Sequence, residues 1–338
     1  MKIAVIGSGS WGTAVSSLLA SKSFDVWLWS WRLEETNALM RDRENKEFLP
    51  GVSLANNITF SNDMGACVQG ASLIVMASPS HAVRGTANAL AKHIQPEQIV
   101  LNIAKGLEPE TLMRLSEVIK DEIPGVRLAV MSGPSHAEEV GRGMATANVV
   151  ASEHDDIPLF IQDVFMNPFF RVYTSDDLLG VELGGAIKNV IALAAGIAVG
   201  LGCGDNTSAA LMTRGIAEIS RLGVAMGAKA ETFAGLTGIG DLIVTCMSQH
   251  SRNRRAGVLI GKGKTLKEAT KEVHMVVEGV NACAAAYELA KKYNVTMPIT
   301  ACTHRVLFEN MPAADAIGEL MGREKRAERE RDILNGAL

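Results

Sequence analysis

The sequence predicts two domains, an α/β domain with a parallel sheet at residues 1–177 and an all-α domain at residues 178–338. Three observations support this prediction. A glycine-rich turn directly follows the first apolar run, and short β-branched runs alternate with amphipathic stretches through the first half. The strand-like alternation then disappears after about residue 177, where long helical patterns take over. An alternating β-α order is typical of parallel sheets covered by helices on both faces.

Strands are predicted where apolar runs are bounded by Gly, Pro, Ser or Asp. These runs lie at 2–6, 24–29, 72–77, 98–104 and 127–132, with two further candidates at 147–152 and 170–174. Helical patterns separate the first five runs, at 12–21, 34–43, 81–93 and 110–123.

The second half is predicted to be helical throughout. Its patterns lie at 178–201, 206–226, 266–271, 278–292 and 298–309. The stretch 190–201 is the most membrane-like, but it is shorter than the ~20 residues of a spanning helix, so we expect a buried helix. The tail at 323–332 carries charges of both signs, which favours a solvated terminal helix.

The composition is typical of a soluble, cytoplasmic protein with a sizeable core. The 338 residues are 47% hydrophobic and 21% charged, which excludes intrinsic disorder. A net charge of −4 gives no electrostatic case for a nucleic-acid binder. The five cysteines are scattered and predict reduced thiols. The seven histidines form no HxH or HxxxH pair, so no metal centre is expected. The apolar start is too short for a signal peptide.

The glycine-rich turn reads GSGSWG, a G-x-G-x-x-G between a predicted strand and a predicted helix. Gly7 would make the tight turn, Gly9 would let the backbone approach a pyrophosphate, and Gly12 would allow close helix-to-strand packing. The anion would bind the free N–H groups at the start of the helix. In this context the motif predicts a Rossmann-type domain that binds a dinucleotide.

The end of the second strand bears on which dinucleotide is bound. An acidic side chain ~20 residues past the turn would accept a hydrogen bond from a ribose 2′-hydroxyl and favour NAD. Here the sequence has Ser30, Trp31 and Arg32, with no carboxylate before Glu34. Arg32 can pair with a 2′-phosphate and Trp31 can flank the adenine, so we predict that NADP is preferred over NAD. The alternative is that Arg32 is only a solvated residue at the turn.

Polar residues follow two more predicted strands, at the carboxyl edge where ligands bind in open α/β sheets. Lys105 follows one strand, and Gly133 and Ser135 follow the next. A lysine can hold an oxyanion, while the glycine and serine supply backbone and hydroxyl donors. Each residue alone is more typical of an ordinary loop, but two such segments beside a cofactor turn favour a functional site.

Lys188 lies inside an otherwise apolar helical pattern, GGAIKNVI. A charge there is costly unless it is paired or faces a polar cavity. The adjacent Asn189 and the preceding glycine pair indicate close approach of another element, and the alternative is a lysine that extends to the surface. To transfer a proton near neutrality the lysine needs a pKa below its usual ~10.4, and we expect burial beside other cations to lower it.

Two further polar sites follow in the helical half. Asp241 is a single acid in the apolar surroundings of GIGDL. The run SRNRR at 251–255 gathers guanidinium, amide and hydroxyl groups, which can hold a phosphate. A solvated basic turn is the alternative interpretation of that run.

Several blocks in order resemble the bacterial-type NAD(P)-dependent sn-glycerol-3-phosphate dehydrogenase family over nearly the whole chain. The blocks are GSGSWGTA, NKEFLPG, KGLE, SGPSHAEEV, GGAIKN, GIGDL, SRNRR and VVEGV. The resemblance implies reversible reduction of dihydroxyacetone phosphate to sn-glycerol 3-phosphate with NADP or NAD, feeding phospholipid synthesis.

The resemblance also implies residue roles. Lys188 matches the proton donor/acceptor, with Lys105 and Asp241 around the reacting carbonyl. The substrate contacts it implies are Lys105, Gly133, Ser135, Lys188, Asp241, Ser251, Arg252 and Asn253. The cofactor contacts it implies are Ser10, Trp11, Arg32, Lys105, Ala137, Arg252, Val276 and Glu278. The residues themselves add Gly7, Gly9 and Gly12 of the glycine turn, and Trp31.

Two departures from the family pattern leave the catalytic residues in place. His136 stands where Phe is common, and Trp31 stands where a polar residue is common. Two alternatives remain open: a related reductase for a carboxylate substrate, such as a β-hydroxyacid dehydrogenase or ketopantoate reductase, and a non-catalytic dinucleotide sensor. Ala-rich helices after Asp205 are consistent with a homodimer, and no membrane insertion is expected.

Overall fold

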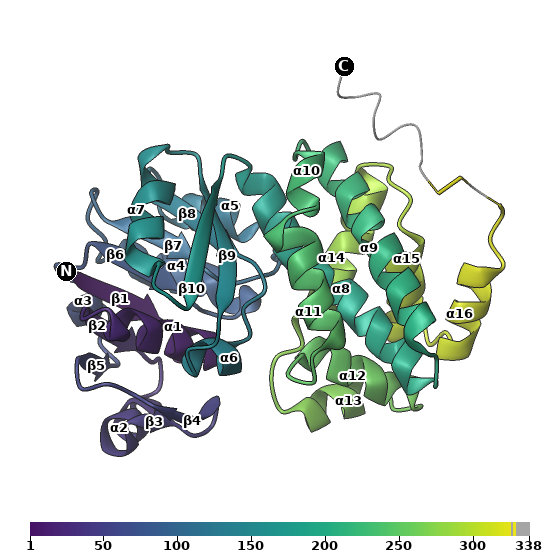
Figure 1. Ribbon diagram of the computed structural model, residues 1–338. Coiled ribbons are helices and arrows are strands. Elements are labelled where there is room, and N and C mark those ends of the chain that lie inside the picture. Colours follow the sequence, from purple (N-terminus) through teal and green to yellow (C-terminus); the bar gives the residue numbers. More distant parts are fainter. Residues whose placement is uncertain (326, 329–338) are drawn as a thin grey trace. The chain divides into compact units, whose positions relative to one another are not determined.

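The computed structural model describes residues 1–325 and 327–328. The chain forms two compact units, Met1–Glu182 and a second that begins at Leu183 (Figure 1). The division falls within a helix, α8 (Leu178–Gly200). The functional boundary that the sequence suggests after residue 177 stays a prediction.

The first unit is built on one large sheet with the strand order β10-β9-β8-β7-β6-β1-β2-β5. Its strands are β1 (Lys2–Ile6), β2 (Asp25–Trp29), β5 (Ile58–Ser61), β6 (Leu73–Met76), β7 (Ile99–Asn102), β8 (Arg127–Ser132), β9 (Thr146–Ser152) and β10 (Phe170–Ser175). All seven predicted strands are therefore confirmed.

The predicted parallel pairing holds from β5 to β8, but β9 runs antiparallel to β8. The connection between β8 and β9 contains only the five-residue helix α6 (Ala137–Gly141). So short a helix does not carry the chain back along the sheet, as a crossover between parallel strands must. β10 then pairs parallel to β9.

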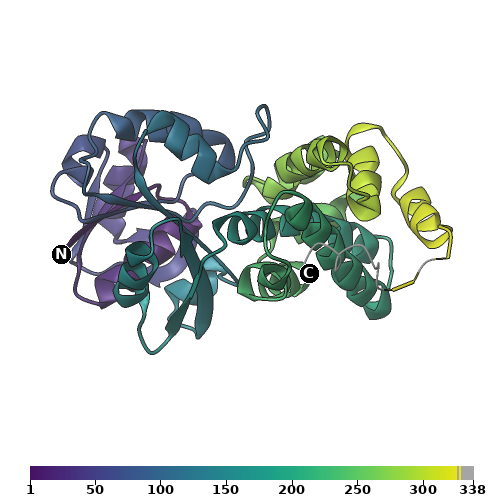
Figure 2. The ribbon, with the colours of Figure 1, turned by 90° about the horizontal axis from the view of Figure 1, so that it is seen from above.

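Helices cover both faces of the sheet, and alternating residues of the central strands face the two helical layers (Figures 1 and 2). On β1, Ile3 and Val5 belong to a core that also includes residues of α1 (Ser10–Ser21) and α7 (Asp156–Phe165). Ala4 and Ile6 belong to a second core, with residues of α3 (Met64–Val68), α4 (Val83–Ala91) and α5 (Leu115–Glu122). Both faces of the central strands are thus apolar, which explains their unbroken hydrophobic runs.

In the first unit the sequence missed several short elements. These are edge strand β5, the small hairpin of β3 (Glu44–Asn45) and β4 (Leu49–Ser53), and helices α3, α6 and α7. The helix predicted at 110–123 begins only at Leu115, because Leu112 has φ +61° and a bridge between Leu107 and Arg114 closes a turn. The helix predicted at 81–93 begins with a 3₁₀ turn (Ser80–Ala82).

The second unit is helical throughout its described residues. Its helices are α8, α9 (Asp205–Ala225), α10 (Ala230–Phe233), a π-helical turn (Leu236–Gly240), α11 (Asp241–Met247), α12 (Arg252–Gly261), α13 (Leu266–Val273), α14 (Glu278–Lys292), α15 (Pro298–Phe308) and α16 (Ala313–Met321). The predicted terminal helix at 323–332 is not formed at 323–325 or 327–328, and its other residues lie outside the described part of the chain.

Helix α8 is the central helix of this unit. It is long and apolar enough to cross a membrane by composition alone, but 89% of its apolar window is buried inside the protein. This agrees with the predicted buried helix. The start of α15 is held by Glu218 of α9, whose carboxylate accepts hydrogen bonds from the backbone N–H groups of Ile299 (2.7 Å) and Thr300 (3.1 Å). Burial raises the pKa of Glu218 to about 7.

Helices α8 and α12 pack with their backbones in contact. Gly196 and Gly200 of α8 face Gly257 and Gly261 of α12, each pair spaced by four residues. A Cβ at Gly257 would lie 2.2 Å from the Leu193 carbonyl oxygen, which is far inside contact distance. Only glycine fits at these positions, so the spacing between the two helices is set by backbone atoms.

Candidate active site

The glycine-rich turn has the geometry that its sequence predicts. Gly7 has φ +121°, and a Cβ at Gly12 would lie 2.0 Å from the Gly7 carbonyl oxygen. At Gly9 a Cβ would meet nothing within 4 Å, so there is room for a ligand to approach the backbone. Helix α1 begins at the next residue, Ser10, followed by Trp11, and no side chain caps its N-terminus. These features fit a pyrophosphate group at this turn.

A residue that the sequence did not single out holds this turn in place. Asn45 lies in the NKEFLPG block and is buried. Its Nδ2 donates to the Ser8 carbonyl oxygen (2.7 Å) and to Thr13 Oγ1 (2.8 Å), while its Oδ1 accepts from the Phe48 N–H (3.1 Å). The block is therefore a support for the dinucleotide turn.

At the end of β2, Trp31 and Arg32 are both exposed and stacked. The Arg32 guanidinium lies 4.5 Å from the Trp31 ring centre. Glu35, three residues later on α2 (Leu33–Asp42), turns back so that its carboxylate accepts from Ser30 Oγ (2.7 Å) and Ser8 Oγ (3.3 Å). The structure thus brings to the turn a carboxylate that comes from helix α2 and not from the strand end.

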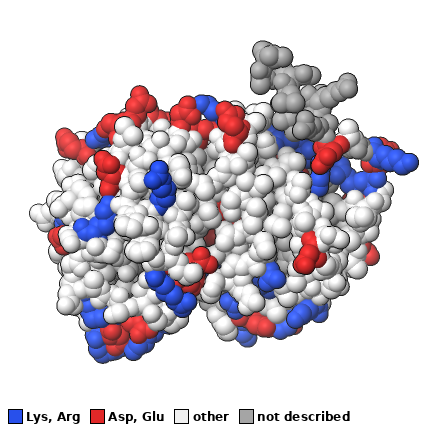
Figure 3. Space-filling model, viewed as in Figure 1, with Lys and Arg blue, Asp and Glu red and all other residues white. Residues whose placement is uncertain are grey.

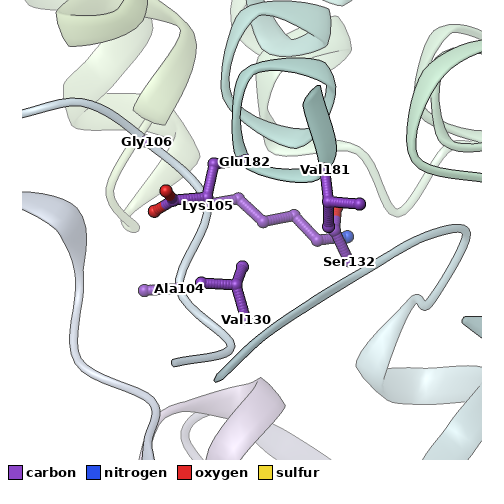
Figure 4. A pocket seen from close by; sticks show the side chains of 7 residues that line it. All are labelled: Ala104, Lys105, Gly106, Val130, Ser132, Val181 and Glu182. Carbon is purple, nitrogen blue, oxygen red and sulfur yellow. The ribbon is translucent and has the colours of Figure 1, made fainter. Parts of the chain in front are cut away.

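Lys105 lies beside the loop after β8, as predicted. Its Nζ donates to the Gly133 carbonyl oxygen (2.7 Å) and to Ser135 Oγ (3.4 Å). Gly133 has φ +140°, and a Cβ there would lie 2.8 Å from Asn148 Oδ1. Figure 4 shows the Lys105 side chain extending past Val181 toward Ser132. This side chain lines a small pocket whose other residues are Ala104, Gly106, Val130, Ser132, Val181 and Glu182.

Glu182 is a buried acid in the wall of this pocket. It accepts hydrogen bonds from the Ser116 N–H (2.9 Å) and the Ser116 hydroxyl, and it pairs with Arg114 (2.9 Å). It thereby joins the start of α8 to the start of α5, which follows the Lys105 loop. Burial raises the pKa of Glu182, against the opposing effect of Arg114. The sequence signal that could have identified Glu182 is its position between the apolar residues Val181 and Leu183.

In the second unit, Lys188 is buried and paired. Its side chain is 7% exposed, and its Nζ donates to Asp241 Oδ1 and to Thr245 Oγ1 (2.7 Å). The alternative of a lysine extended to the surface is therefore wrong. The charged group to which it donates is the Asp241 carboxylate and not the expected cation. Thr245 was not predicted; it lies one turn after Asp241 on α11. Burial raises the pKa of the neighbouring Cys246 thiol to about 12, so it stays neutral.

The SRNRR run forms the first turn of α12. Ser251 caps the helix by accepting from the Arg254 N–H (3.2 Å), and Arg252 is the first helical residue. Asn253 is buried: its Nδ2 donates to Asn189 Oδ1 (2.9 Å), and its Oδ1 accepts from the Gly279 N–H (2.8 Å). The amide therefore joins α8, α12 and α14, a structural task that the sequence did not reveal.

The remaining predicted cofactor residues lie at helix starts. Ala137 is the first residue of α6 and is buried. Glu278 is the first residue of α14, and Val276 precedes that helix by two positions. Among the described residues, no group of three His, Cys, Asp or Glu side chains could hold a metal ion.

A sheet with this dinucleotide turn, followed by a helical unit with a buried Lys–Asp pair, defines a dinucleotide-dependent oxidoreductase. Comparison with known protein families supports this class for both units of the chain. Residues 2–157 match the N-terminal part, and residues 177–318 the C-terminal part, of NAD-dependent glycerol-3-phosphate dehydrogenase. The chain belongs to the NAD-dependent glycerol-3-phosphate dehydrogenase family.

Individual relatives are similar along their whole length. A glycerol-3-phosphate dehydrogenase [NAD(P)+] of Moorella thermoacetica is 56% identical over 329 residues, covering 97% of this chain and 98% of its own. A glycerol-3-phosphate dehydrogenase [NAD(P)+] of Fusobacterium nucleatum is 52% identical over 330 residues, which cover 97% of this chain and 98% of its own. The crystal structure of a glycerol-3-phosphate dehydrogenase from Coxiella burnetii superposes with a TM-score of 0.92 at 36% identity, covering 95% of this chain and 99% of its own.

Proposed function

We propose that this chain catalyses the reversible NAD(P)H-dependent reduction of dihydroxyacetone phosphate to sn-glycerol 3-phosphate, for glycerophospholipid synthesis in the cytoplasm. NADP is the preferred cofactor, and NAD is also used. The observation that carries the proposal is the buried pair of Lys188 and Asp241, in a chain whose other unit has a dinucleotide turn. An ammonium buried at such cost and held by two partners is suited to proton transfer.

The chemistry divides between the cofactor and the chain. The reduced nicotinamide supplies a hydride when bound. Lys188 donates the proton that the developing alkoxide of the carbonyl needs, and it accepts that proton in the reverse direction. Asp241 and Thr245 orient the Lys188 ammonium through the hydrogen bonds already described. Lys105, fixed by the Gly133 carbonyl, stabilises the negative charge on the carbonyl oxygen.

The substrate phosphate binds at the start of α12 in this proposal. Arg252 supplies a charged donor, and Ser251 and Asn253 complete the anion site at the helix N-terminus. The side chain of Asn253 already joins three helices, so its main contribution is to fix the position of the turn. Binding energy from this remote phosphate positions the reacting carbonyl. Gly133 and Ser135 bind the substrate beside Lys105.

The cofactor is held by the residues of the glycine turn and by those at the neighbouring strand and helix ends. The pyrophosphate lies on Gly9, Ser10 and Trp11, with Gly7 and Gly12 shaping the turn. Arg32 pairs with the 2′-phosphate and Trp31 flanks the adenine. The remaining contacts come from Lys105, Ala137, Arg252, Val276 and Glu278.

The surface is consistent with a small-molecule enzyme. On the face shown in Figure 3, acidic and basic side chains are both spread over the surface, in keeping with a net charge of −4. On that face, such a mixture gives no steering field for a polyanion. We propose that the protein binds no nucleic acid, inserts into no membrane and forms a homodimer.

The test is to follow the absorbance of NADPH with and without dihydroxyacetone phosphate, and with ketopantoate as a comparison. Oxidation that requires dihydroxyacetone phosphate supports the proposal, and a kcat/KM ratio for NADPH over NADH above one supports the cofactor preference. Turnover of ketopantoate instead would identify a reductase of carboxylate substrates. Cofactor binding with no turnover of either substrate would identify a dinucleotide sensor.

A further inference from the structure

The carboxylate of Glu35 occupies an unusual position at the end of β2. Glu35 is the third residue of α2, where an acidic side chain often folds back to cap its own helix. Here no side chain caps α2, and the Glu35 carboxylate reaches the glycine turn instead. It accepts from Ser30 Oγ at 2.7 Å and from Ser8 Oγ at 3.3 Å, and the two hydroxyl oxygens are 2.6 Å apart.

The two serines make this position well defined. Ser8 and Ser30 are 6% and 1% exposed, while the Glu35 side chain is 18% exposed. The two buried hydroxyls therefore hold the carboxylate in place, and part of the Glu35 side chain remains exposed at the surface of the turn. Its second oxygen lies 3.7 Å from Arg32 Nη1, and the Arg32 side chain is 55% exposed. A positive and a negative group thus stand together where β2 ends.

The place of this pair determines what it can recognise. In Rossmann-type domains an acidic group at the end of the second strand accepts a hydrogen bond from the ribose 2′-hydroxyl of NAD, whereas an arginine there accommodates the 2′-phosphate of NADP. This chain has Ser30 at the strand end and supplies the acid from the following helix. A carboxylate favours a hydroxyl donor and repels a phosphate, and Arg32 has the opposite preference.

We propose that Glu35 is a specificity-determining residue for the cofactor, opposing Arg32 so that NADH remains a usable ligand beside NADPH. This inference rests on the proposed function, because it assumes that both dinucleotides bind at the glycine turn. Replacing the carboxylate with an amide removes a charged acceptor for the 2′-hydroxyl and removes repulsion of the 2′-phosphate. Both effects shift the ratio of dissociation constants toward NADPH.

The experiment measures the Kd of NADPH and of NADH by isothermal titration calorimetry, without the second substrate. We expect Glu35→Gln to raise the ratio Kd(NADH)/Kd(NADPH) about tenfold, equivalent to about 1.4 kcal/mol. The matched control is Glu34→Gln, which changes the net charge equally at the adjacent, exposed position. We expect that control to leave the ratio within twofold of the wild-type value.

Two results overturn the inference. One is a shift in Glu35→Gln of less than threefold, and the other is an equal shift in Glu34→Gln. If Glu35→Gln fails to fold, Glu35→Asp is measured instead; it withdraws the carboxylate from the serines by one methylene and should shift the ratio at least threefold in the same direction. Wild-type protein that binds neither dinucleotide overturns the proposed function and this inference together, whereas normal binding with unchanged ratios overturns this inference alone.

Discussion

Removing the ammonium of Lys188 should reduce both stability and activity, by separable amounts. Lys188→Met keeps much of the side-chain volume on α8 but leaves the Asp241 carboxylate, only 2% exposed, without its cation. Breaking a buried ion pair by removing one partner costs about 3–5 kcal/mol, because the remaining charge is uncompensated. We expect this loss in the free energy of unfolding, measured by urea denaturation.

The effect on activity should be larger than stability alone explains. Removing a general acid lowers kcat by about 10²–10⁴-fold. The measurement is NADPH oxidation with dihydroxyacetone phosphate under conditions where the variant is still folded. The Kd of NADPH should stay within a few-fold of the wild-type value, because Lys188 is not among the proposed cofactor contacts.

A double variant separates the two effects. In Lys188→Met/Asp241→Asn no charge is left uncompensated, so at least half of the lost stability should return, while kcat stays low. Turnover of Lys188→Met within tenfold of wild type would refute the role of Lys188 as proton donor. A double variant no more stable than Lys188→Met alone would refute the reasoning about the ion pair.

Three further predictions concern charge, packing and substrate binding. Burial raises the pKa of Glu218 from an ordinary 4.5 to about 7, so the folded protein favours the protonated carboxyl. Its contribution to the free energy of unfolding is therefore lost as the pH rises from about 4.5 to about 7. Glu218→Gln should therefore remove a fall of about 3 kcal/mol in the free energy of unfolding between pH 4.5 and 8. Gly257→Ala should cost about 1–3 kcal/mol or more through overpacking, whereas Gly318→Ala, at an exposed helical position with open space, should gain up to ~1 kcal/mol. Arg252→Ala should lower kcat/KM for dihydroxyacetone phosphate about 10- to 100-fold through the loss of a charge-assisted hydrogen bond.

Each of these has a clear contrary result. A Glu218→Gln variant with the wild-type dependence of stability on pH would show that this carboxylate is not the titrating group. Equal effects of alanine at Gly257 and Gly318 on the urea midpoint would contradict the backbone contact between α8 and α12. Unchanged KM and kcat in Arg252→Ala would reject Arg252 as the phosphate anchor.

The sequence predicted the features that depend on local pattern. The strands of the central sheet are continuous apolar runs, and the glycine turn needs positive φ and close backbone contact at fixed spacing. Lys188 could be singled out because a charge in a buried helix requires a partner. The identity of that partner required the structure, because Asp241 is 53 residues away in the chain.

Contacts between side chains that are far apart in the sequence were not predictable in the same way. Asn45 supports the dinucleotide turn from 37 residues away, and Glu182 reaches Ser116 over 66 residues. Glu35 was overlooked because the carboxylate comes from the next helix instead of the strand end. Short elements such as β5 also lack enough residues to establish a pattern, and tertiary pairing with β2 determines their conformation.

The facing glycines of α8 and α12 have a consequence for how this protein tolerates change. Lys188 and the SRNRR turn lie on two helices that touch through main-chain atoms, so the distance between the proposed proton donor and the proposed anion site does not depend on how neighbouring side chains are arranged. Substitutions in the surrounding hydrophobic residues can accumulate without altering that distance. The four glycines fix the spacing of the two helices, and we expect a library randomised at the apolar residues around α8 and α12 to tolerate more variety at those residues than at the glycines.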